Sequence, residues 1–153
     1  MVKDMKKIIK LLLVLIVMAT IFMFSNDNDV SSDKKSDGFI IRTSEFILNR
    51  KLTDKEKEFY TSKYVVIVRK TAHFTIYFLL GLFFCSFLKE FDLNNKKLIL
   101  YTVIFVFLYA CSDEIHQLFI SGRSGEILDV LIDTLGGVTS SILYTNFRVR
   151  RKL

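Results

Sequence analysis

The sequence contains no proline and no tryptophan, and only two cysteines and two histidines occur among its 153 residues. Cys85 and Cys111 lie in separate apolar runs without metal-ligand spacing, so the chain has no cysteine-based zinc motif. It also lacks a glycine-rich phosphate loop and a serine-nucleophile motif. No basic stripe with interleaved aromatics appears, which argues against a nucleic-acid partner. We therefore predict no cofactor and no metal site of the His/Cys kind.

What the sequence has in abundance is apolar residues, and they are arranged in blocks. Hydrophobic residues make up 51% of the chain, phenylalanine alone counts 15, and the mean hydropathy is +0.36. Long apolar runs predict membrane-spanning helices over residues 8–24, 64–88, 98–118 and 127–147. The first run ends without small residues at a cleavage position, so we interpret it as an anchor rather than a signal peptide. The expected fold is a single all-α membrane domain over residues 1–153 with four transmembrane helices.

Residues 25–63 form a polar segment between the first two spans. Its first part, residues 25–38, is typical of a mobile, solvated stretch. Apolar residues then follow near helical spacing over residues 39–48, and Thr53 with Glu56 fits a capping box for a second short helix. The short helices either lie on the membrane surface or pack as a loop, and the sequence does not separate these alternatives.

Basic residues set the expected orientation. The net charge is +6, and the excess lies in the N-terminal head, in the Lys89–Lys97 connector and in a tail with Arg148, Arg150, Arg151 and Lys152. Short basic segments stay on the cytoplasmic side. We therefore predict a multi-pass protein of the plasma membrane with both termini inside.

In this orientation the polar ends of the second, third and fourth spans meet at similar depth on the outer side. Ionisable groups beside apolar runs are costly unless they face one another or water. We therefore predict a polar pocket at the extracellular ends of these spans, formed by Arg69, Lys70, His73, Tyr77, Asp113, Glu114, Gln117, Arg123, Asp129 and Asp133.

Within this pocket, His73 and Asp113 are the candidate acid/base pair. Asp113 and Glu114 point about 100° apart on a helix. We expect Asp113 to face His73, with Glu114 and Gln117 toward the fourth span or the outer surface. The alternative is that these acids only balance the basic side chains.

Two further features carry open alternatives. Arg123, in a glycine-containing link, suits a phosphate or carboxylate, or else anchors the chain at the headgroups. Asp129 and Asp133, together with Asp113, suit a hard cation.

At these residues the sequence resembles the VanZ-like family of small integral membrane proteins. The matching pieces are Arg69-Lys70-x-x-His73-Phe74-x-x-Tyr77, Leu80-Gly81, Ser112-Asp113-Glu114-x-x-Gln117, Gly122-Arg123, Asp129-Val130-x-x-Asp133 and Gly136. Two positions depart from the family pattern. Ser121 stands where the family often has proline, and Asp133 stands where it often has asparagine, which makes this pocket more acidic.

The resemblance implies a four-helix envelope protein of Gram-positive-type bacteria that lowers susceptibility to teicoplanin-type glycopeptides. Three hypotheses follow. The pocket binds an anionic lipid-linked or peptidoglycan-related ligand, with membrane lipids, a cell-wall precursor or the glycopeptide as partners. Alternatively, the protein is a hydrolase or transferase acting on a lipid headgroup. A small ion-coupled transporter is the third hypothesis, which the lack of a visible inverted repeat weakens.

Overall fold

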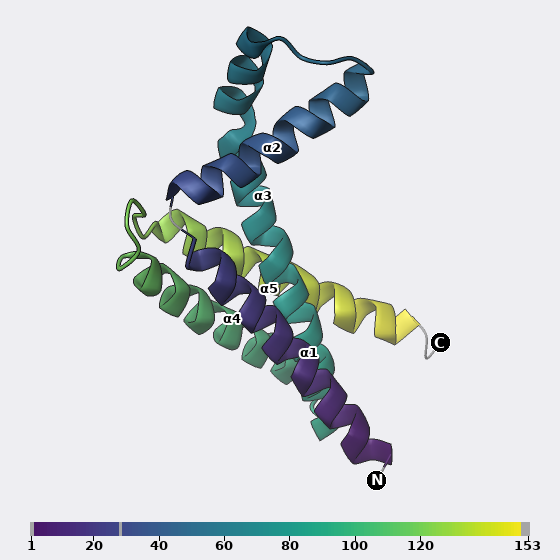
Figure 1. The fold of residues 1–153 in the computed structure, drawn as a ribbon. Helices are drawn as coiled ribbons and strands as arrows, with labels where there is room; N and C mark the ends of the chain where they lie inside the picture. The colour runs from purple at the N-terminus through teal and green to yellow at the C-terminus, as the bar shows by residue number, and fades with distance from the viewer. Residues whose placement is uncertain (1, 28, 151–153) are drawn as a thin grey trace.

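A computed structural model of the protein describes residues 2–27 and 29–150, and its regular structure there is entirely helical (Figure 1). The side chains of residues 2, 3, 29–31 and 148–150 lie outside this description. The elements in chain order are α1 Val2–Ser25, α2 Asp29–Leu48, α3 Asp54–Leu88, the short 3-10 helix η1 Lys89–Phe91, α4 Asn95–Gln117 and α5 Ile127–Arg150.

The described part holds four helices long and apolar enough to cross a membrane. They cover Asp4–Ser25, Asp54–Phe91, Asn95–Gln117 and Ile127–Phe147. Each overlaps one predicted span, so the expectation of an all-helical fold with four candidate membrane helices is confirmed. The inside location of both termini stays a prediction, and the basic tail on which it partly rests lies outside the described side chains.

The helices α1, α4, α5 and the second half of α3 pack into one bundle (Figure 1). Its core consists of buried residues from three helices, namely Val14, Val17, Ile21, Tyr77, Leu80, Val106 and Ala110. At one end Lys10, which lies inside the first predicted span, donates to the Ser86 carbonyl at 3.1 Å and pairs with Glu90. The other end gathers the C-terminus of α1, the start of α2 and the link between α4 and α5 (Figure 1). The helix ends therefore alternate between the two ends of the bundle, as successive membrane crossings require.

Small residues let α5 approach its neighbours closely. A Cβ atom added at Gly136 would lie 2.6 Å from the Phe74 carbonyl oxygen of α3, and one at Gly137 would lie 2.8 Å from Val106 Cβ of α4. Ser140 and Ser141 are fully buried on the same helix. Close approach through small residues is how membrane helices gain packing contacts without a hydrophobic driving force.

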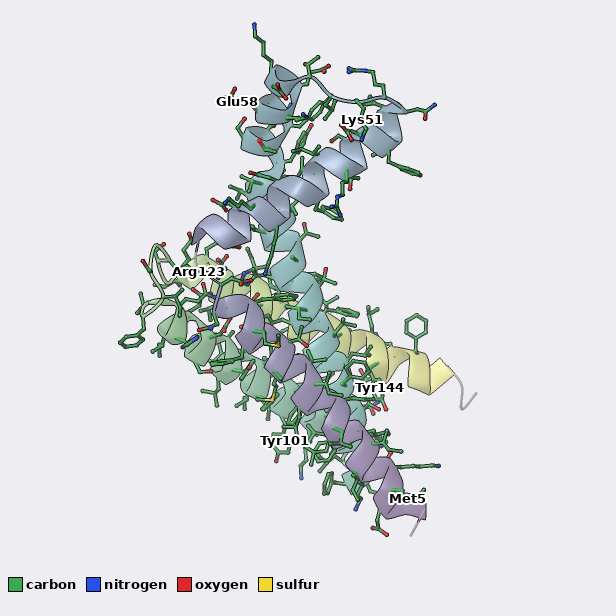
Figure 2. The ribbon with its side chains drawn as sticks, viewed as in Figure 1. Met5, Lys51, Glu58, Tyr101, Arg123 and Tyr144 are labelled. Carbon is green, nitrogen blue, oxygen red and sulfur yellow. The ribbon has the colours of Figure 1, made fainter. Side chains whose placement is uncertain are left out.

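The helix α2 and the first part of α3 form an arm that stands away from the bundle, with Lys51 and Glu58 near its tip (Figure 2). At 35 residues, α3 is about 53 Å long, which exceeds the roughly 30 Å hydrocarbon core of a bilayer. Its charged beginning, residues 54–63, therefore extends beyond the part that can be buried in lipid.

The structure of the arm differs from the irregular stretch expected for residues 25–38. Residues 25–38 are not a solvated irregular stretch, because α2 begins at Asp29 and runs through Gly38. The predicted capping box is confirmed, since the Glu56 carboxylate accepts the Thr53 backbone N–H at 2.9 Å. It opens the long helix α3, however, rather than a separate short helix.

Candidate functional site

The predicted ionisable residues gather where α3, α4 and α5 meet, at the end of the bundle that carries the α4–α5 link. On α3, His73 Nδ1 lies 3.4 Å from Asp133 Oδ1 of α5. Asp133 is fully buried, and the His73 side chain retains 22% of its exposure. Gly136, which lies one turn after Asp133, sets this contact because it brings α5 against the backbone of α3 at Phe74.

His73 Nδ1 thus lies beside Asp133 rather than beside Asp113, the partner we expected. Asp113 is buried and accepts a hydrogen bond from Gln117 Nε2 at 3.3 Å on its own helix. Glu114 faces the fourth span, as expected: its Oε2 accepts the backbone N–H of Glu126 at 2.8 Å, immediately before α5.

Lys70 forms an ion-pair group beside the contact between His73 and Asp133. Its ammonium lies 2.7 Å from Glu126 Oε2 and also pairs with Asp129. The hydrogen bond from Lys70 lowers the pKa of the Glu126 carboxyl. Sequence reasoning left Glu126 out of the pocket, although its position one turn before Asp129 could have indicated it.

Two arginines connect this end of the bundle to α1 and α2. Arg69 Nη1 lies 3.2 Å from Asp33 of α2, and Arg123 Nη2 donates to the Phe24 carbonyl at the end of α1 at 3.5 Å. In Figure 2, Arg123 lies at the α4–α5 link, close to the start of α2. Asp33 was not predicted as a site residue, because its partner depends on how α2 folds back over α3.

A cavity of about 690 Å³ opens between the end of α1, α2 and α3. Five of the predicted residues line it, namely Arg69, His73, Tyr77, Asp113 and Arg123. Much of the remaining wall is apolar and includes Ile21, Phe24, Phe39, Ile67, Val68, Ala72, Ile76 and Leu79. The other predicted residues, Lys70, Glu114, Gln117, Asp129 and Asp133, are not among its lining residues. The structure therefore divides the predicted set into two groups. One lines the cavity, and the other joins Glu126 in an ionic cluster that His73 borders, formed by Lys70, Glu114, Asp129 and Asp133.

Some polar atoms at this border have no hydrogen-bond partner among the described residues. They include the Tyr77 hydroxyl and Arg123 Nε, both on residues of the cavity wall. Buried polar groups normally have a hydrogen-bond partner, so these two atoms are available to a bound ligand or water.

Comparison with known proteins gives a family. The VanZ/LLP1 family model matches residues 10–148, which is nearly the whole chain. The chain therefore belongs to the VanZ/LLP1 family, as its motifs indicated. No curated protein and no solved structure matches it.

Proposed function

We propose that this VanZ/LLP1-family membrane protein binds an anionic lipid-linked ligand of the cell envelope in the cavity between α1, α2 and α3. The observation that carries the proposal is an apolar cavity with cationic side chains in its wall, at one end of a membrane bundle. In the predicted orientation this end faces outward at the plasma membrane, where cell-wall precursors are exposed. Sequestering such a ligand would change glycopeptide susceptibility.

The apolar part of the cavity suits a hydrocarbon chain. Its volume of about 690 Å³ falls within the roughly 300–1,000 Å³ of ligand pockets. Phe24, Phe39 and Ile76 come from three different helices and face this common space. An acyl or prenyl tail lying there would bury apolar surface that the protein alone leaves uncovered.

The charged part suits a phosphate or carboxylate. Lys35, Arg69 and Arg123 line the cavity against two acids, Asp27 and Asp113. Lys35 already pairs with Asp27, and Arg69 with Asp33. Arg123 makes one long contact to a carbonyl and has an unpartnered Nε. Its planar guanidinium can donate two parallel hydrogen bonds to an anion, so we assign it the headgroup.

The absence of tryptophan allows a direct test. Both phenylalanines lie on the arm with similar exposure, but Phe39→Trp places a sole indole in the cavity wall, whereas Phe59→Trp places one away from the cavity. With full-length protein in neutral detergent, a polyprenyl phosphate should shift the emission of the Phe39→Trp protein saturably and leave that of the Phe59→Trp protein unchanged. Adding Arg123→Gln should weaken binding about tenfold or more, since hydrogen bonds to charged groups contribute about 1.5–3 kcal/mol. Equal binding of neutral polyprenol, or no saturable shift, would contradict the proposal.

One observation favours a second candidate, an enzyme that hydrolyses or transfers a lipid headgroup. His73 lies in the cavity wall and is held by a buried carboxylate behind it, which is how a general base is oriented. His73→Ala and Asp113→Asn, each tested for teicoplanin susceptibility and for extracted lipids, separate the two functions. A lipid species gained or lost would favour the enzyme, and lost protection with unchanged lipids would favour binding.

A further inference from the structure

Three side chains from three different helices converge behind the cavity wall. They are His73 of α3, Glu114 of α4 and Asp133 of α5, and each offers one ligand atom within 4.8 Å of the other two. His73 Nδ1 and Asp133 Oδ1 lie 3.4 Å apart. The sequence separations of 41 and 19 residues hide this grouping, which only the packing of α5 against α3 and α4 creates.

The carboxylates of this group have lone pairs that no described donor satisfies. Asp133 is 0% exposed, and neither of its carboxylate oxygens accepts a hydrogen bond. Glu114 is 6% exposed; its Oε2 is fixed by the Glu126 N–H, and its Oε1 has no partner. A carboxylate withdrawn from water without donors is costly, so these oxygens are arranged for a species that the chain itself does not supply.

The charges around the group are also unbalanced. Lys70 is the cation nearest in sequence to His73, and it already pairs with Glu126 and Asp129. Arg69 is directed to Asp33, and Arg123 to the Phe24 carbonyl. Glu114 and Asp133 therefore share a low-dielectric site with one basic side chain, that of His73, among the described residues. Asp113 of α4 lies nearby and adds a further acid. Negative charge held at this depth is neutralised either by a proton or by a compensating cation.

We propose that His73 Nδ1, Glu114 Oε1 and a carboxylate oxygen of Asp133 bind one divalent metal ion that joins α3, α4 and α5. One imidazole and two carboxylates suit Zn²⁺ or Mn²⁺ better than Ca²⁺ or Mg²⁺, which take oxygen ligands. Bonds of about 2.0–2.2 Å place ligand atoms roughly 3–4 Å apart, so small side-chain rotations close the site.

This ion differs from the hard cation expected among Asp113, Asp129 and Asp133. Asp129 is held by Lys70, and Asp113 by Gln117. The metal site goes beyond the proposed ligand cavity and does not depend on it, although His73 borders both.

The test uses full-length protein in neutral detergent, stripped with EDTA and dialysed against Zn²⁺ or Mn²⁺. We expect one equivalent of bound metal by elemental mass spectrometry and a rise in the unfolding temperature. Glu114→Gln and Asp133→Asn should each lower the affinity at least tenfold. The matched control is His116→Gln, because His116 stacks on Phe22 at 4.8 Å on another face of α4. That variant should keep both the stoichiometry and the temperature shift.

Folding and metal loss can be told apart. Asp133→Asn removes a buried negative charge, so without metal it should unfold no lower than the stripped wild type. Co²⁺ adds a second readout, since its visible d–d absorption should appear in the wild type and in His116→Gln but not in Asp133→Asn. Absence of Zn²⁺ and Mn²⁺ binding by the wild type, or full binding by Glu114→Gln and Asp133→Asn, would overturn the site. The polyprenyl phosphate shift of the Phe39→Trp protein reports separately on the cavity, so the two proposals can fail independently.

Discussion

The arm and the ionic cluster use the same kinds of charged residue in opposite ways. On the arm, Lys51 pairs with Glu45 at 2.8 Å, and Arg50 pairs with Glu56 at 2.5 Å. The basic partners of these pairs are exposed, since Arg50 retains 51% and Lys51 90% of the side-chain accessible surface. In the cluster the carboxylate of Asp133 is fully buried, and its oxygens lack hydrogen-bond partners among the described residues.

Water explains why the two regions differ. An exposed pair gives up little when it breaks, because water solvates both partners, so such pairs contribute little to stability. A buried charge has no such alternative, and its unpaired form is strongly destabilising. We infer that the charges of the arm keep it solvated, whereas those of the cluster are retained for what they bind.

Glycine substitutions should give the largest difference in stability between the bundle and the arm. Gly136→Ala would place a Cβ 2.6 Å from the Phe74 carbonyl oxygen, so α5 must shift away from α3. We expect a loss of about 3 kcal/mol, the upper range for overpacking. Gly38→Ala on the arm meets no atom within 4 Å and improves helix propensity, so it should be neutral or stabilising. Unfolding in mixed micelles measures both, and equal losses would refute the close approach.

Removing one cation from each region should give the next largest contrast. Lys70→Met leaves Glu126 and Asp129 without their shared partner, and Lys70 retains only 23% of its side-chain exposure. We expect a loss of about 2 kcal/mol, below the roughly 3–5 kcal/mol of a fully buried pair. Lys51→Met on the arm should leave the unfolding temperature unchanged. A matching loss in both variants would mean that burial does not separate the regions.

The smallest expected effect is the dependence of fold stability on pH. The hydrogen bond from Lys70 lowers the pKa of Glu126, and that from Lys51 lowers the pKa of Glu45. Each group therefore stabilises the fold above the ordinary carboxyl pKa of about 4.3, and this contribution is lost as pH falls through the lowered value.

Thermal unfolding between about pH 6 and pH 3 checks this sign. Glu126→Gln and Glu45→Gln should each flatten the decline toward low pH, and added salt should weaken both contributions. A steeper decline in either variant would show that the sign is wrong.

The sequence predicted the four long apolar helices because each contains a long apolar run, a signal that needs no tertiary information. The beginning of α2 was mispredicted because the sequence there carries no such apolar signal. Residues 29–38 have no apolar periodicity, and the helix there is supported by contacts between segments, such as Asp33 with Arg69.

The site was predicted as a set of residues, but the partners within it were not. Spacing along one helix shows that Asp113 and Gln117 share a face. It does not show how α5 is rotated against α3. That rotation depends on Gly136, which brings Asp133 rather than Asp113 to His73. For the same reason the sequence could not indicate that Arg69 and Lys70, adjacent in the chain, face α2 and α5 respectively.

The helix α3 runs without interruption from the tip of the arm, through Lys70 and His73, into the bundle. It contains no proline, and its single glycine, Gly81, lies beyond His73. No hinge therefore separates the two regions. The tip of the arm and His73 therefore belong to one continuous rigid element, and a displacement of the tip would be transmitted along α3 to the histidine.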